Sequence, residues 1–133
     1  MYSALIEYME KMADIPMDLI FDWTFFTEEV YTRLGYKEYT IFDAYPDLVQ
    51  RFKNLQFDIY YFSLYLEDIQ LYEKRLKRVH HNYQSFSLEN SKEQQNTYKQ
   101  IANELKEVGI SVYEIAMDNP TNAYFQIAKI LNL

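Results

Sequence analysis

One uninterrupted stretch, residues 45–86, limits the possible folds of this chain more than any other part. It contains no glycine, and its single proline is at position 46. Hydrophobic residues recur in it at alternating steps of three and four, which is the repeat of a helix that packs along other helices. Ten of the twelve positions in this stripe are apolar or aromatic; the twelve are Tyr45, Leu48, Phe52, Leu55, Ile59, Phe62, Leu66, Ile69, Glu73, Leu76, His80 and Tyr83.

A single helix over this stretch would be too long for the chain to enclose. It would run roughly 60 Å, whereas a compact domain of 133 residues is about 35–40 Å across. We therefore expect a break near Lys53-Asn54, followed by a long central helix over about residues 56–86. The alternative is a projecting helix whose stripe is covered by a second copy, which would make the protein a homodimer.

Start and stop signals before this stretch predict two shorter helices. The first covers residues 2–13, and the second covers about 16–34, with Asp14 as its N-cap and Gly35 as its C-terminal stop. The second helix would be apolar on nearly every side, as is typical of a central helix. Only Tyr36–Phe42 shows a weak strand pattern.

Three further helices are predicted after the central one. Residues 91–108 form the first, which Gly109 ends. Ser111 and Glu114 have the spacing of a capping box and predict a short second helix, and Asn119-Pro120 begins the last. The sequence therefore predicts an all-α fold of six or seven helices in a single domain, residues 1–133.

Charge and aromatic content point toward binding. The net charge is −7, but residues 1–73 carry −9 and residues 74–133 carry +2. An acidic half repels nucleic acid and anionic membranes and attracts a basic protein surface. The 14 tyrosines and nine phenylalanines either fill the core or form a binding surface, where tyrosine is enriched.

The sequence carries no signature of catalysis. There is no cysteine, so disulfides, iron–sulfur clusters and thiol chemistry are excluded. There is no nucleophile elbow, phosphate-binding loop or zinc-protease motif, so we expect no enzyme and no cofactor. The first residues lack a secretory signal and no apolar run is long enough to span a membrane, so we expect a cytoplasmic protein.

Acidic residues recur every four positions from Glu10 through Asp22, and Glu28-Glu29 follow. They would form either a strip that docks onto a basic protein groove or an ordinary solvated face. A subset of the tyrosines would extend the strip, because adjacent tyrosines cannot all face one helix seam. The predicted partner-binding residues are Asp18, Asp22, Glu28, Glu29, Tyr60, Tyr61 and Tyr65.

A basic run interrupts the acidic composition; it comprises Lys74, Arg75, Lys77, Arg78 and His81, with His80 between them. It would contact a phosphate backbone, dock an acidic partner, or simply lie in solvent. The two histidines do not predict a metal site, because adjacent helical side chains point about 100° apart. On the stripe, Glu73 and His80 would either set the register of packing or lie exposed beside it.

These observations favour a small, acidic, tyrosine-rich, non-enzymatic protein that binds a basic partner protein and inhibits or regulates it. An inhibitor of a host enzyme, encoded by a phage or mobile element, would have these properties. The alternative is a transcriptional regulator that contacts nucleic acid through residues 74–81. An enzyme or small-ligand carrier built in a helical core is a third hypothesis, with no residue pattern in its favour.

Overall fold

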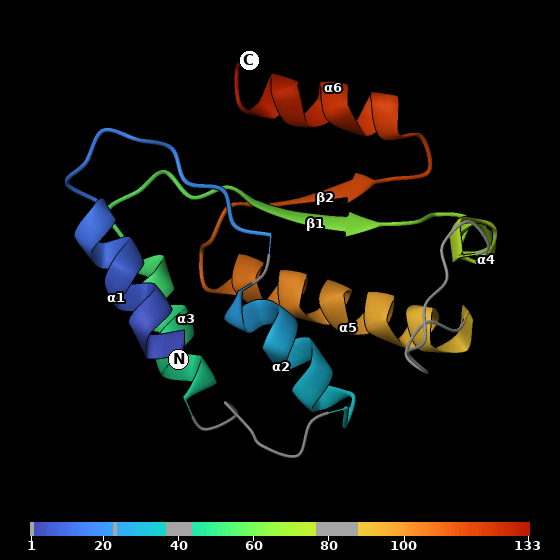
Figure 1. Cartoon of the computed structure of the whole chain (residues 1–133), viewed down its shortest axis with the longest axis horizontal. Helices are drawn as coiled ribbons and strands as arrows, with labels where there is room; N and C mark the ends of the chain where they lie inside the picture. The colour runs from blue at the N-terminus through green and yellow to red at the C-terminus, as the bar shows by residue number, and fades with distance from the viewer. Residues whose placement is uncertain (1, 23, 37–43, 77–87) are drawn as a thin grey trace.

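A computed structural model describes residues 2–22, 24–36, 44–76 and 88–133. Two short strands form a middle layer, with helix α5 on one side and helix α6 on the other (Figure 1). Helices α1 and α3 lie together at one end, and α2 packs against α5. The elements, in chain order, are α1 (Tyr2–Met12), α2 (Phe25–Arg33), α3 (Tyr45–Lys53), β1 (Tyr61–Tyr65), α4 (Gln70–Leu76), α5 (Leu88–Glu107), β2 (Val112–Ala116) and α6 (Pro120–Ile130).

The predicted all-α fold is wrong, because the chain contains a parallel β-sheet. Strand β1 pairs with β2, with Tyr61 opposite Val112 and Tyr65 opposite Ala116. The ladder continues just beyond the strands, where the Met117 N–H donates to the Tyr65 carbonyl at 2.7 Å. Helices α4 and α5 connect the two strands, so this half of the chain is a β–α–β unit.

The predicted long helix over residues 56–86 is also wrong. Residues 61–65 are strand β1 and residues 70–76 are the short helix α4; residues 77–86 lie outside the described part of the chain. The predicted break is confirmed, since α3 ends at Lys53 with Asn54 as its C-cap. Without the long helix, the reason for expecting a homodimer is removed, and the oligomeric state stays a prediction.

The hydrophobic core lies between α5 and the group formed by α1, α2 and α3. Phe26 lies near its centre and meets the Phe52 and Tyr61 rings edge-on, at 5.1 Å between centroids in each case. Tyr61 therefore joins β1 to the helical side of the molecule. The fully or largely buried members of the core are Ile6, Met9, Phe25, Phe26, Val30, Tyr45, Leu48, Ile101, Leu105 and Ile110.

Local helix signals were read correctly at several ends. Gly35 follows α2 with a φ of +74°, and Gly109 follows α5 with a φ of +91°. Both glycines take the left-handed conformation that ends a helix without a steric penalty. At the start of α6, the Asn119 side chain accepts hydrogen bonds from the N–H groups of Thr121 and Asn122, which confirms the predicted cap.

Other helix starts were wrong. The capping-box pattern Ser111–Glu114 opens strand β2 instead of a helix, because valine, tyrosine and isoleucine fit a half-buried strand better than a helix. Helix α5 begins at Leu88, before the predicted position 91. Helix α2 begins at Phe25, where the Thr24 side chain accepts a hydrogen bond from the Phe26 N–H, so Asp14 is not its N-cap.

Candidate functional site

The late start of α2 leaves a long connection after α1, and most of the predicted acidic ladder lies in it. We call residues 14–22 the acidic–apolar loop. Asp14, Asp18 and Asp22 are all exposed there. Because these residues are not in a continuous helix, their carboxylates are not aligned in one strip as the four-residue spacing predicted.

The same loop exposes large apolar side chains. Ile20 is 96% exposed, Ile15 and Met17 are each 45% exposed, and Phe21 is 38% exposed. Single exposed apolar residues are common on protein surfaces, but several together mark an interaction surface. The acidic–apolar loop therefore combines three carboxylates with four apolar side chains within nine residues.

The base of this loop is held against the rest of the molecule. The Ile15 N–H donates to the Met12 carbonyl at 3.0 Å, which continues the end of α1 into the loop. Arg51 of α3 pairs with Glu10 of α1 at 2.9 Å. A shallow hollow of about 280 Å³ brings Glu10, Ala13 and Asp14 beside residues 54–56. The start of the loop is thus placed beside α1 and the end of α3.

Sequence reasoning missed this apolar surface, because it placed Ile20 and Phe21 on a buried helix. A signal was present. Residues 14–24 contain Pro16, three aspartates and several β-branched or aromatic residues, all of which are poor helix formers. That composition predicts a loop better than a helix.

Two of the predicted binding residues, Glu28 and Glu29, lie in the interior, with 3% and 1% of their surface exposed. The Arg33 Nε donates to Glu29 at 2.9 Å, and the two terminal nitrogens of Arg33 donate to Glu104 of α5, also at 2.9 Å. Burial alone would lower the pKa of Arg33, but its hydrogen bonds to Glu104 and Glu29 raise it above the usual value. Arg33 holds α2 to α5 through Glu104, and a partner cannot reach the buried carboxylates of Glu28 and Glu29.

The three predicted tyrosines divide between surface and core. Tyr60 is 42% exposed, and its ring stacks on Tyr113 with 6.2 Å between centroids. Tyr61 packs against the core, and burial raises the pKa of its hydroxyl. Tyr65 is partly exposed at the end of β1. Tyr60 is therefore the best placed of the three for a surface contact.

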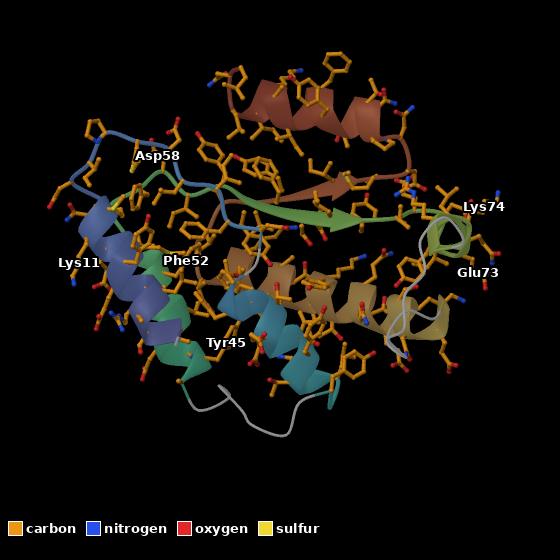
Figure 2. The ribbon with its side chains drawn as sticks, in the orientation of Figure 1. Lys11, Tyr45, Phe52, Asp58, Glu73 and Lys74 are labelled. Carbon is orange, nitrogen blue, oxygen red and sulfur yellow. The ribbon has the colours of Figure 1, made fainter. Side chains whose placement is uncertain are left out.

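Two residues of the predicted basic run are described, and they differ in role. Lys74 is exposed on α4, beside the exposed Glu73 (Figure 2). Arg75 is turned toward the protein, where its guanidinium donates to the carbonyls of Met117 and Asp118 at 2.9 and 3.3 Å. Lys77, Arg78, His80 and His81 lie outside the described residues. Nucleic-acid contact through this run stays a prediction.

The carboxyl ends of parallel strands often hold ligands, but here side-chain contacts occupy that position. The Asp118 carboxylate accepts hydrogen bonds from the N–H groups of Glu67 and Asp68, at 2.7 and 2.8 Å. The hydrogen bonds from Asp68 and Glu67 lower the pKa of Asp118 below its usual value. This arrangement ties β1 to β2, and among the described residues it leaves no free catalytic group there.

Comparisons with known proteins add no functional information. No protein-family model, curated protein or solved structure matches this chain. In the ranges that the structure describes, no group of three or more histidine, aspartate or glutamate residues is placed to hold a metal ion. None of the described helices is both long enough and apolar enough to cross a membrane. Function must therefore be argued from the surface of the chain.

Proposed function

We propose that this chain is a non-enzymatic, cytoplasmic protein that binds a partner protein through the acidic–apolar loop and so inhibits or regulates it. The observation that carries the proposal is Ile20, which is 96% exposed at the centre of a loop with three further exposed apolar side chains. Tyr60, also exposed, is a candidate contact outside the loop.

The chemistry of the loop defines the partner. Burying one isoleucine or phenylalanine side chain contributes about 1.5–3 kcal/mol, so two such anchors supply enough energy for the centre of an interface. The surrounding aspartates would raise the association rate with a basic surface more than the final affinity. The partner should present an apolar pocket with lysine or arginine at its rim.

Affinity capture from a nuclease-treated cytosolic extract tests the proposal with paired variants. Ile20→Ser/Phe21→Ser removes the two anchors, and Tyr124→Ser/Phe125→Ser removes two aromatic side chains of α6 that are 67% and 63% exposed. We expect the α6 variant to retain the partner and the loop variant to lose at least about 100-fold in affinity. Equal capture by both variants would contradict binding through the loop.

The aspartates are tested separately with the isolated partner. Asp18→Lys/Asp22→Lys should slow association and reduce its dependence on salt, while dissociation changes little. Both side chains are exposed, so the fold should be unaffected. Stopped-flow association at two salt concentrations measures the effect, and an unchanged association rate would remove the basic partner surface from the proposal.

The nucleic-acid alternative makes a different prediction for the same capture experiment. Partners would then disappear on nuclease treatment, and Lys74→Glu would weaken binding to a DNA duplex and reduce the slope of affinity against salt by about one unit. The exposed Lys74 on α4 is the described residue available for such a contact. Partners that survive nuclease would count against this alternative.

A further inference from the structure

The two edges of the sheet differ in how their backbone groups are satisfied. The Tyr61 N–H donates to the Ser111 carbonyl at 3.0 Å, and the Tyr65 carbonyl accepts from the Met117 N–H at 2.7 Å, so the backbone groups of Tyr61 and Tyr65 point toward β2. Because successive residues of a strand alternate in direction, the backbone groups of Val112, Glu114 and Ala116 on β2 point away from β1. They form the free edge of β2.

The outer edge of β1 is capped at its carboxyl end, at Leu66, by a side chain of α5. The Leu66 N–H donates to the Gln95 Oε1 at 2.9 Å, and the Gln95 Nε2 donates to the Leu66 carbonyl at 2.8 Å. This side-chain amide reproduces the pair of bonds that a neighbouring strand would make. In the described part of the chain, no residue bonds the outward backbone groups of β2 in this way. The edge of β1 is therefore blocked at Leu66, whereas the described edge of β2 is open along its whole length.

A groove runs along this open edge, between β2 and α6. Its volume is about 470 Å³, and it is lined by Val112, Tyr113, Glu114, Ile115, Gln126, Lys129 and Ile130. Helix α6 forms the outer wall because it lies over the face of the sheet opposite α5 (Figure 1), where Ala123 is 1% exposed and Ile115 is 3% exposed. A strand edge beside a helix is the arrangement that binds an extended peptide by strand addition.

The charge of the groove favours an acidic ligand. Glu114 is already neutralised by Lys106 of α5, with 2.9 Å between Nζ and Oε2. Lys129 makes no ion pair with any residue in the described ranges. The uncompensated charge in the groove is therefore positive, although the chain as a whole carries −7.

We propose that the groove between β2 and α6 binds an extended peptide segment of a partner protein. The segment adds to β2 as a third strand, pairs with the outward backbone groups of Val112, Glu114 and Ala116, and places an acidic side chain beside Lys129. This site goes beyond the proposed function, because the groove is lined by none of the residues of the acidic–apolar loop.

A second copy of the chain fits this edge less well than a partner peptide. Two copies related by a two-fold axis would pair β2 with β2 antiparallel, and each copy brings a net charge of −7. Like net charges repel, which opposes the association of two copies. A short peptide with one acidic residue near Lys129 carries far less charge than a second copy, so it meets a much weaker repulsion.

The test uses a display library of random twelve-residue peptides, selected on the intact chain and then measured as single synthetic peptides by calorimetry. Glu114→Pro removes the outward N–H, whereas Glu114→Ala removes the same side chain and keeps the N–H. Proline is tolerated on a strand edge whose N–H faces solvent. We expect Glu114→Pro to bind at least about tenfold more weakly than Glu114→Ala, and Lys129→Glu to lose selectivity for acidic peptides.

Hydrogen exchange on the unmodified chain keeps the test valid even if Glu114→Pro does not fold. The amides of Tyr113 and Ile115 face β1 and should be protected in all conditions. The amides of Val112, Glu114 and Ala116 should exchange freely in the chain alone and become protected when the peptide is added. Protection of these three amides is the result expected.

Three results would overturn the proposal. They are selection of no peptide, peptide binding that leaves these amides unprotected, and protection in the free chain that grows with protein concentration, which would assign the edge to a second copy. The Ile20→Ser/Phe21→Ser variant should bind the peptide as tightly as the unmodified chain. Failure of the loop proposal and failure of the groove proposal are thus separate results.

Discussion

Replacement of Arg33 by methionine should strongly destabilise the fold. Methionine keeps most of the apolar stem of the side chain but removes the guanidinium that pairs with Glu29 and Glu104. The Glu29 side chain is 2% exposed, and its Oε2 has no hydrogen-bond partner among the described residues. Glu29 then keeps a buried carboxylate without a compensating charge.

The magnitude follows from this burial. Breaking a buried ion pair by removing one partner costs about 3–5 kcal/mol. A chain of 133 residues unfolds with an entropy of about 0.28 kcal/mol/K. We therefore expect the Tm of Arg33→Met to fall by about 11–18 °C, measured by circular dichroism at neutral pH.

Two further variants separate the buried pair from the exposed one. Glu104 is 42% exposed, so Glu104→Gln should cost about 1 kcal/mol or less. Glu29→Gln combined with Arg33→Met leaves no buried charge and should recover at least half of the lost stability. The reasoning is refuted if Arg33→Met and Glu104→Gln lower the Tm equally, or if the double variant is no more stable than Arg33→Met.

Three other perturbations test separate parts of the fold. Gln95→Met opens the protected edge of β1 and leaves two backbone groups unpaired, so urea unfolding should show a loss of about 1–3 kcal/mol; an unchanged midpoint would contradict the edge assignment. Gly109→Ala forces alanine into a φ of +91°, which should cost about 1–2 kcal/mol in the same assay. No steric clash adds to this cost, because the added methyl meets only the Lys53 side chain, at 3.8 Å. The pKa of Asp118 is lowered in the folded chain by hydrogen bonds from Asp68 and Glu67. The folding stability that this carboxylate contributes is therefore complete above the unfolded pKa of about 3.9, and it is lost as the pH falls through the folded pKa. Asp118→Asn should remove the loss of stability at low pH that Asp118 causes. If the urea midpoints of the variant and the unmodified chain change in parallel between pH 6 and 3, this prediction is wrong.

Helix ends could be predicted because their causes are local. Gly35 and Gly109 adopt positive φ where a helix must stop, and Asn119 caps α6 with its own side chain. The break after Lys53 followed from the length of a continuous helix compared with the size of the chain. None of these inferences depends on what another part of the chain does.

The sheet could not be predicted because its cause is non-local. Residues 61–65 are apolar or aromatic except for Ser63, and periodicity cannot decide between a helix and a strand over so short an apolar run. The pairing with residues 112–116 decides it. In the same way, Ser111 and Glu114 match a helix cap in isolation, yet Glu114 lies in a strand and pairs with Lys106.

The candidate surface was predicted in part. The acidic residues Asp18 and Asp22 are exposed as expected, whereas Glu29 lies inside the protein. The four-residue spacing of Glu29 and Arg33 was a readable sign of an ion pair within α2. The exposure of Ile20 was not readable from hydrophobicity, because an apolar residue in a loop and one in a core helix have the same side chain.

The parallel pairing of β1 and β2 also sets the order of events during synthesis. Val112 follows Tyr61 by 51 positions, and translation proceeds at about 5–20 residues per second, so β1 waits roughly 3–10 s for its partner. During that interval the nascent chain presents Tyr61–Tyr65, an uncharged and largely aromatic segment, without a strand to pair with. Such segments are prone to aggregate, and slow translation of the α5 region would lengthen the exposure. Yield in a cell should therefore depend on codon choice between residues 66 and 116, even though the protein made is the same.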